Sequence, residues 1–216
     1  MRVVTGQAKG RKLKTPNTVG TRPIMDRVKT ALFDILSTQV EDARFLDLFA
    51  GTGSVGIEAL SRGARHATFI EMNGKILKLV RENLQITQLA DRAETLHTDA
   101  FKFLQAHQIL SSTRNGQVPA NPLVTSRQRI YDILYVAPPQ YEELAARALA
   151  LIDSSTLLAD NGQVIVQIHP KERPGVAAVE CRHLILTDER RYGSTLLMFY
   201  QQKVGQQGEG EVRDGQ

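Results

Sequence analysis

Three acidic residues of this sequence lie at or just after the ends of short apolar stretches, where their side chains could bind a polar ligand. Asp47 ends one apolar stretch and opens the run DLFAGTG, while Glu71 and Asp99 follow the next two stretches. Because the carboxyl ends of parallel strands meet at one edge of a sheet, we expect the three carboxylates to lie near one another. Such carboxylates could accept the hydroxyls of an adenosine ribose and the amino group of its adenine.

The glycines after Asp47 strengthen this interpretation. Gly51, Gly53 and Gly56 satisfy the pattern GxGxxG, which allows a tight turn and a close approach of the backbone to a ligand. Glu71 lies 20 residues beyond Gly51, the spacing typical of a ribose-binding acid. The carboxylate of Asp47 would repel the pyrophosphate of NAD but attract a sulfonium and an ammonium. The sequence therefore favours S-adenosylmethionine as the cofactor.

The remaining cofactor contacts are expected around the same turn. Phe49 lies inside it, and the Ala100 N–H could meet an adenine ring nitrogen while Asp99 meets the amino group. The alternative is that Glu71 and Asp99 merely cap the helices that follow, as acidic residues often do. The combination of three acids with a correctly placed glycine turn favours a binding site.

A second turn has the residue types to hold a nucleobase. The apolar stretch 133–136 runs into APPQY at 137–141. Proline has no N–H, so a turn with two prolines presents carbonyl oxygens, which an exocyclic amino group needs as acceptors. The amide oxygen of Gln140 could also accept, and Tyr141 could stack on a flipped base or simply pack against the protein. We therefore predict a reaction turn made of Ala137, Pro138, Pro139, Gln140 and Tyr141.

The elements that position these turns follow from the hydrophobic pattern. Short apolar runs alternate with amphipathic stretches after residue 43, which predicts a Rossmann-like α/β fold with a mostly parallel sheet and a terminal antiparallel hairpin. The predicted strands are 44–48, 67–70, 93–97, 130–136, 164–168, 184–186 and 196–200, and the predicted helices are 26–36, 53–61, 74–87, 100–110 and 142–153.

Composition limits the class of protein. The chain has 216 residues, of which 42% are hydrophobic and 23% charged, as expected for one folded domain with small appendages. Cys181 is the single cysteine, so no intrachain disulfide or cysteine metal cluster can form, and no apolar run approaches the ~20 residues of a membrane span. We expect a cytoplasmic protein with no metal and no membrane contact.

The N-terminal segment is strongly basic. Residues 1–29 hold eight cations against the single acid Asp26, although the net charge of the chain is only +4. A basic arm suits phosphate contacts, because neutralised phosphates release counterions, and a merely solvated charged face is the alternative. The eight cations are Arg2, Lys9, Arg11, Lys12, Lys14, Arg22, Arg27 and Lys29.

Four stretches resemble the RsmD family, bacterial methyltransferases that modify a guanine N2 in small-subunit (16S) ribosomal RNA. They are TRPIMDRVKTALFDIL at 21–36, DLFAGTGSVGIEALSRGA at 47–64, FIEMN at 69–73 and ERRYGSTLLMFY at 189–200. The resemblance covers nearly the whole chain. It implies a seven-stranded class I methyltransferase sheet at 21–203. The sequence pattern itself predicts a basic N-terminal strand or hairpin at 1–20 and a disordered tail, rich in Gly, Gln and Glu, at 204–216.

The resemblance also implies site residues and a partner. Asp47, Gly51, Gly53, Glu71 and Asp99 would contact the cofactor, and the substrate would be small-subunit rRNA, on an assembly intermediate rather than on naked RNA. The residues expected to contact RNA are Lys9, Arg11, Lys12 and Arg22 in the N-terminal segment and Arg190, Arg191 and Tyr192 at the terminal hairpin. The polar segment 111–129 is expected to be functional or disordered.

One motif departs from the family. Its reaction turn reads Asp/Asn-Pro-Pro-Tyr/Phe, whereas here Ala137 and Gln140 stand at the first and last of those positions. Asp132 is not a substitute, because five strand residues separate it from Ala137 by about 16 Å. An RNA-binding assembly protein that has lost turnover therefore remains an alternative, as do a DNA adenine N6 methyltransferase and an NAD-dependent dehydrogenase.

Overall fold

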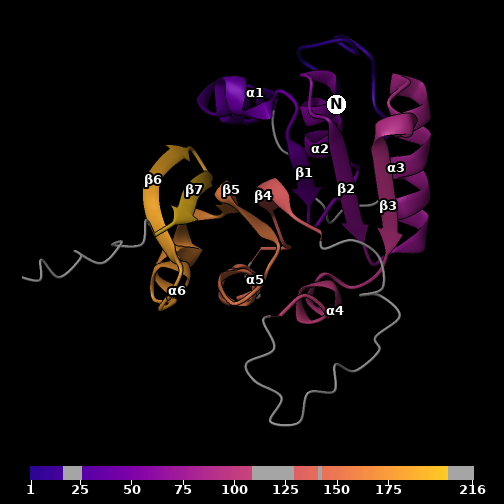
Figure 1. The fold of residues 1–216 in the computed structure, drawn as a ribbon. Coiled ribbons are helices and arrows are strands. Elements are labelled where there is room, and N and C mark those ends of the chain that lie inside the picture. Colours follow the sequence, from indigo (N-terminus) through magenta and orange to yellow (C-terminus); the bar gives the residue numbers. More distant parts are fainter. Residues whose placement is uncertain (17–25, 109–128, 141–142, 204–216) are drawn as a thin grey trace, which may run out of the picture.

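The computed structural model describes residues 1–16, 26–108, 129–140 and 143–203. Its centre is a seven-stranded sheet in the order β3-β2-β1-β4-β5-β7-β6, in which β1 to β5 are parallel and β7 is antiparallel to both its neighbours (Figure 1). The strands are β1 (Arg44–Asp47), β2 (His66–Glu71), β3 (Ala93–His97), β4 (Tyr131–Val136), β5 (Leu158–Ile168), β6 (Leu184–Tyr192) and β7 (Thr195–Gln202).

The sheet confirms the predicted Rossmann-like α/β class and all seven predicted strands. The terminal hairpin is present as well, since β6 and β7 pair from Leu184 with Gln202 to Tyr192 with Thr195. Two strands are much longer than predicted, because β5 already begins at Leu158 and β6 continues to Tyr192, whereas the ends of the other strands lie within two residues of their predicted positions. Most of their extra residues are polar or glycine, so these stretches lack the continuous apolar signal on which the prediction relied.

The helices cover both faces of the sheet. They are α1 (Asp26–Leu36), α2 (Ser54–Ser61), α3 (Gly74–Thr87), α4 (Ala100–Gln105), α5 (Leu144–Asp153) and α6 (Arg173–Ala177), with 3-10 turns at Ser37–Val40, Ala90–Arg92 and Pro170–Glu172.

Two helix boundaries were predicted wrongly, and one short helix was not predicted. The helix predicted over 100–110 ends at Gln105, because Gln108 pairs with Ser155 in an antiparallel bridge that requires extended backbone. The helix predicted from Glu142 begins at Leu144, since Glu143 has a left-handed φ of 55°. The short α6 was not predicted. Ile109, Leu110 and Glu142 lie outside the described residues, as do most of the insertion and the tail.

Successive side chains of a strand point to opposite faces of the sheet, and the two faces carry two separate apolar clusters. In β4, Ile133 and Tyr135 face one cluster while Leu134 and Val136 face the other. The first cluster contains buried side chains of α1, α2 and α3, and the second contains buried side chains of α4, α5 and α6. Figure 1 shows where these helices lie around the sheet. We call the first side of the sheet the α1–α3 face.

The N-terminal segment forms the predicted hairpin and packs on the core. Arg2 and Lys12 form an antiparallel bridge, and the Val3 and Leu13 N–H groups donate across the hairpin to Arg11 and Met1 over 3.0 Å each. Val3 and Leu13 are buried in the cluster of the α1–α3 face. The hairpin is thus packed against the sheet domain rather than projecting from it.

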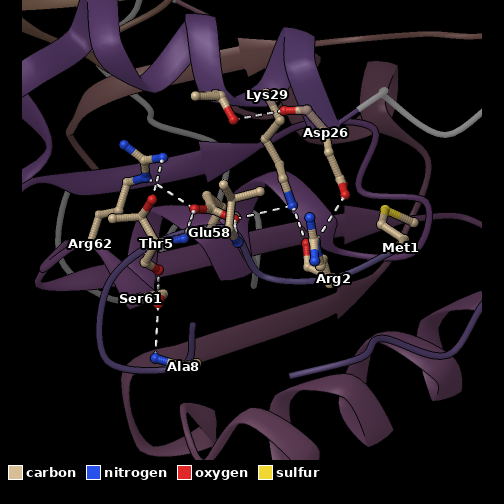
Figure 2. Close-up of polar contacts among 12 residues, drawn as sticks. Met1, Arg2, Thr5, Ala8, Asp26, Lys29, Glu58, Ser61 and Arg62 are labelled. Atoms are coloured by element: carbon tan, nitrogen blue, oxygen red, sulfur yellow. Dashed lines mark hydrogen bonds and ion pairs between the residues drawn. The ribbon is translucent and has the colours of Figure 1, made fainter. Parts of the chain in front are cut away.

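A buried ion pair joins the hairpin to two helices (Figure 2). Lys29 of α1 and Glu58 of α2 lie 3.1 Å apart with both side chains 0% exposed. The Lys29 ammonium also donates to the Arg2 carbonyl at 2.7 Å, and the Glu58 carboxylate accepts from the Val4 and Thr5 N–H groups at 2.8 and 2.9 Å. Counting Lys29 among the basic residues that could meet phosphates was therefore wrong, because its charge is neutralised inside the protein.

Candidate active site

Asp47 is the last residue of β1 and is 1% exposed. Its Oδ2 accepts from the Gly56 N–H at 3.1 Å, whereas its buried Oδ1 has no hydrogen-bond partner among the residues that the structure describes. Burial raises the pKa of the Asp47 carboxyl to about 7, against the opposing effect of the Gly56 hydrogen bond and with a smaller contribution from the Glu71 charge. A buried carboxylate oxygen without a partner is costly, which points to a cationic or hydrogen-donating ligand.

The glycines of the turn are required by conformation and by space. Gly51 and Gly53 have φ values of 52° and 77°, in the left-handed region that glycine favours. A Cβ at Gly56 would lie 2.4 Å from the Phe69 ring, so this glycine lets α2 pack closely on β2. The turn therefore brings the backbone and the start of α2 to the carboxyl end of β1.

Glu71 ends β2 and faces the glycine turn. Its Oε2 accepts from the Gly51 N–H at 3.1 Å and its Oε1 from the Asn73 N–H at 2.8 Å. The side chain of Asn73, not of Glu71, caps α3 by accepting from the Lys75 and Ile76 N–H groups. The helix-capping alternative is thus wrong for Glu71, whose carboxylate oxygens each keep a further lone pair for a ligand.

Asp99 does act as a helix cap. Its Oδ1 accepts from the Lys102 N–H at 3.0 Å at the start of α4, so the capping alternative holds for this oxygen. Ala100, the first residue of α4, is buried. Both residues follow β3, at the same sheet edge as Asp47 and Glu71.

Aromatic and apolar side chains flank this edge. Phe49 is half-buried and meets the Phe101 ring edge-on at 6.0 Å. Met72, directly after Glu71, is 68% exposed, although it is large and apolar. Sequence analysis missed Met72, and the signal that could have found it is an apolar residue directly after the acid of the FIEMN motif.

The predicted reaction turn follows β4, next to the glycine turn. The Leu48 N–H donates to the Tyr135 carbonyl at 3.0 Å, which joins the two turns. Ala137 is half-buried against the cluster of the α1–α3 face, Pro138 is buried, and Pro139 and Gln140 are exposed. Tyr141 lies outside the described residues.

Asp132 lies at the opposite end of the same strand. Its Oδ2 accepts from the Arg44 N–H at 2.7 Å, where β1 begins. As expected, Asp132 does not replace the acid or amide that the family has at position 137.

Comparison with known proteins identifies the family. Residues 1–201 match the model of the family described as conserved hypothetical protein 95, which is the RsmD family. The chain belongs to the RsmD family. YlbH of Bacillus subtilis is 31% identical over 203 residues, which cover 94% of this chain and 100% of that protein. Ribosomal RNA small subunit methyltransferase D of Escherichia coli K12 is 30% identical over 212 residues, which cover 98% of this chain and 94% of that protein.

A solved structure with a similar sequence also has a similar fold. The structure of yhhF from Escherichia coli has a TM-score of 0.74 at 30% identity and covers 94% of this chain and 98% of its own. The sheet order and these relatives establish the class I methyltransferase fold and place this RsmD-family chain among methyltransferase enzymes.

The predicted RNA contacts of this RsmD-family chain are only partly exposed. Lys9 and Lys12 are exposed on the hairpin, and Arg22 lies outside the described residues. Arg11 is half-buried, because its guanidinium donates to the Ile86 carbonyl and to the Gln88 side chain at the end of α3. These bonds give Arg11 a structural role.

The tip of the β6–β7 hairpin lies at the carboxyl edge of the sheet, since β6 runs parallel to β5. Arg190 and Arg191 are exposed; Arg190 pairs with Asp188 at 2.9 Å, and Arg191 donates to the Gly193 carbonyl at 3.2 Å. Tyr192 is half-buried against the core cluster.

Within the described ranges, no three His, Cys, Asp or Glu side chains are grouped so that they could hold a metal ion. In the same ranges, no helix is long and apolar enough to cross a membrane.

Proposed function

We propose that this chain transfers a methyl group from S-adenosylmethionine to the N2 of a guanine in small-subunit rRNA, within an assembly intermediate of the small ribosomal subunit. The observation that carries the proposal is the buried Oδ1 of Asp47, which has no hydrogen-bond partner in the described parts of the chain. It lies beside the glycine turn, next to a proline turn of hydrogen-bond acceptors. The names of the relatives supply the RNA class, and the resemblance supplies the guanine N2.

The residues at the sheet edge fit this cofactor. A cationic sulfonium and ammonium would neutralise the Asp47 carboxylate, whereas the pyrophosphate of NAD would repel it. Glu71 would accept the ribose hydroxyls, and Gly51 and Gly53 would let the backbone approach closely. Bound there, the cofactor supplies an electrophilic methyl group on its sulfonium.

The adenine would lie between the ends of β2 and β3. Asp99 and the Ala100 N–H would bind its polar edge, since the Asp99 carboxylate has a second oxygen besides the one that caps α4. Phe49 would contact the nucleoside, and the exposed Met72 would lie against the adenine ring. A large apolar side chain that is exposed without a ligand is suited to such a contact.

The proline turn would hold the target base. The carbonyls of Ala137 and Pro138 are the backbone acceptors that the turn offers to the amino group, the amide oxygen of Gln140 is its side-chain candidate, and Pro139 would keep the turn rigid. Tyr141 would stack on the flipped base. Catalysis would come mainly from positioning, because the displacement of the methyl group is direct and needs no covalent enzyme intermediate.

The exposed cations would bind RNA phosphates. Lys9 and Lys12 on the hairpin, and Arg190 and Arg191 on the β6–β7 hairpin, are the exposed described candidates. The proposed RNA-binding set is completed by Arg22, Tyr192 and Arg11, although the guanidinium of Arg11 also binds the end of α3. In this scheme residues 1–20 serve RNA binding, residues 21–203 form the catalytic domain, and residues 204–216 form a disordered tail.

A second candidate is an RNA-binding assembly protein without turnover, which the absence of an acid or amide at Ala137 favours. Incubation of the chain with methyl-labelled S-adenosylmethionine and under-methylated small subunits separates the two. Label in rRNA supports the enzyme, while tight subunit binding without label supports the assembly protein. Label in an adenine-containing DNA duplex instead would favour the DNA methyltransferase.

A further inference from the structure

A hydrogen bond between side chains of two strands lies close to the reaction turn. The Tyr135 hydroxyl of β4 donates to the Gln167 Oε1 of β5 at 2.7 Å. Tyr135 is buried, and Gln167 is half-buried near the carboxyl end of its strand. Burial, and to a lesser degree the Asp47 charge, raises the pKa of Tyr135 well above 10, so its hydroxyl keeps its proton and remains a donor.

The register of the two strands places Gln167 beside Ala137. Tyr135 pairs with Ile165 and Val136 with Val166, so one further step along both strands reaches Ala137 and Gln167. Neighbouring strands lie about 4.8 Å apart, and side chains two residues apart point to the same face. Ala137 and Gln167 therefore share the α1–α3 face with Tyr135 and Ile165. With the register continued in this way, the amide of Gln167 would lie next to the space that an Asp or Asn side chain at position 137 would occupy.

We propose that the amide oxygen of Gln167 is the side-chain acceptor for the target amino group, in place of the acid or amide missing at Ala137, and that Tyr135 is a positioning residue that fixes this amide. The inference rests on the proposed methyl transfer. An amide oxygen has two acceptor lone pairs, of which the Tyr135 hydroxyl uses one. The other can accept an N–H hydrogen of the exocyclic amine.

The chemistry balances without a further reactant. The lone pair of the amine nitrogen forms the N–C bond as the C–S bond breaks and its electrons return to sulfur. The nitrogen then loses one proton to water. Gln167 holds one N–H and so aims the lone pair, which is the positioning effect that the family obtains from its acid or amide.

Gln167 is better placed for this role than Gln140. It lies within a paired strand and is held by Tyr135, whereas Gln140 is exposed on the turn. Ordering a free glutamine side chain costs up to ~2 kcal/mol of conformational entropy. Because the Tyr135 hydrogen bond already restricts the Gln167 side chain, less conformational entropy is lost when the substrate binds.

The test compares single-turnover methylation of under-methylated small subunits by the full-length wild type and variants. Gln167→Leu should lower the methyl-transfer rate constant on the order of a hundredfold, as when one preorganised partner of a reacting group is removed. Its affinity for S-adenosylmethionine and for subunits should stay within twofold. Gln167→Glu keeps an acceptor and should retain most of the rate.

Gln163→Leu is the matched control. Gln163 lies on the same strand and face, four residues or about 13 Å from Gln167, and its buried Oε1 has no hydrogen-bond partner in the described structure. This variant should keep the wild-type rate. Tyr135→Phe should lower the rate by less than Gln167→Leu, since the amide remains but is no longer held.

The decisive comparison is between Gln167→Leu and the double variant that also carries Ala137→Asn. Because the second change restores an amide, the methyl-transfer rate constant of the double variant should be at least tenfold higher than that of Gln167→Leu. Three results would overturn the role of Gln167 but leave the proposed function standing. They are a Gln167→Leu rate within twofold of wild type, no recovery on adding Ala137→Asn, and a larger loss for Gln140→Ala than for Gln167→Leu. A wild-type chain that transfers no methyl group to any subunit would overturn the proposed function as well.

Discussion

At the scale of single residues, Asp47 shows how a binding group can destabilise the empty protein. Its pKa is raised from 3.8 to about 7, so the folded state binds this proton more tightly than the unfolded chain. The stability that Asp47 contributes is full below pH 3.8 and is lost as the pH rises through about 7. Above that pH the ionised carboxylate lowers stability by on the order of 4 kcal/mol relative to acid pH, which a bound cation can offset.

Asp47→Asn should therefore stabilise the ligand-free protein at pH 8 but not at pH 4, because only the ionised form is penalised. The same change should weaken S-adenosylmethionine binding at pH 8 by at least tenfold. Melting temperatures and calorimetric titration measure the two effects. In the wild type, affinity should fall from pH 8 to pH 6, and in Asp47→Asn it should be flat. Equal pH profiles would contradict the assigned role.

The sequence predicted where the acids lie but not what each one contacts. The spacing of Asp47, Glu71 and Asp99 after apolar runs was enough to place them at one edge. That Asp99 caps α4 while Glu71 does not cap α3 depends on Asn73, a competing cap two residues later. Competition between neighbouring polar side chains is decided by local geometry, which spacing does not specify.

At the scale of elements, the N-terminal hairpin forms as predicted, but its packing on the core and the burial of Lys29 in α1 did not follow from the sequence. The run of cations was visible in the sequence, but the partner of Lys29 was not, since Glu58 lies 29 residues away in the fully buried α2. The Tyr135–Gln167 bond escaped prediction for the same reason. It depends on the register of β4 and β5, which the intervening residues do not reveal.

The ion pair should respond unequally to loss of its two partners. Glu58→Leu leaves the buried Lys29 ammonium without its counter-charge and the Val4 and Thr5 N–H groups without their acceptor, so it should cost about 3–5 kcal/mol. Lys29→Met should cost less, because Glu58 keeps both N–H donors and Arg62 at 3.0 Å. Urea unfolding measures the difference. A greater loss from Lys29→Met would contradict this account of the cluster.

Two glycines of the hairpin allow a matched test of its packing. Gly6 and Gly10 both have a φ of 83°. A Cβ added at Gly6 would lie 1.8 Å from the Ser61 carbonyl oxygen, whereas a Cβ added at Gly10 would have no described atom within 4 Å. Gly10→Ala should cost only about 1–2 kcal/mol of backbone strain. Gly6→Ala should also displace the hairpin from α2 and speed hydrogen exchange at the Gln7 and Ala8 amides. Equal exchange in the two variants would show that the contact with α2 is unimportant.

At the scale of the whole molecule, the sheet was the easiest feature to predict. Apolar runs of β1 to β4 alternate with helical stretches, and the parallel topology follows from that order. The short α6 and the early end of α4 were not predictable, because five residues carry little periodic signal and the Gln108–Ser155 bridge is a tertiary contact.

The distribution of charge predicts how binding depends on salt. The net charge is only +4, so RNA affinity should come from local cations rather than from the overall field. Replacing both Lys9 and Lys12 with Gln should reduce the slope of log affinity against log salt by up to ~1.8, since each phosphate contact contributes about 0.7–0.9. Arg65→Gln changes an exposed charge before β2 that already pairs with Asp42 at 3.8 Å, so it should leave the slope unchanged. Filter binding to small-subunit rRNA at several salt concentrations would decide this, and equal slopes would remove the hairpin from the RNA-binding surface.

The most direct test of the account is to identify the methylated nucleoside by mass spectrometry. Under-methylated small subunits would be incubated with S-adenosylmethionine and the full chain, and their rRNA digested to nucleosides. The wild type should yield N2-methylguanosine approaching one per subunit, and Gln167→Leu should lower the initial rate on the order of a hundredfold. If no methylated nucleoside forms, or if another base is methylated, the proposed reaction is wrong.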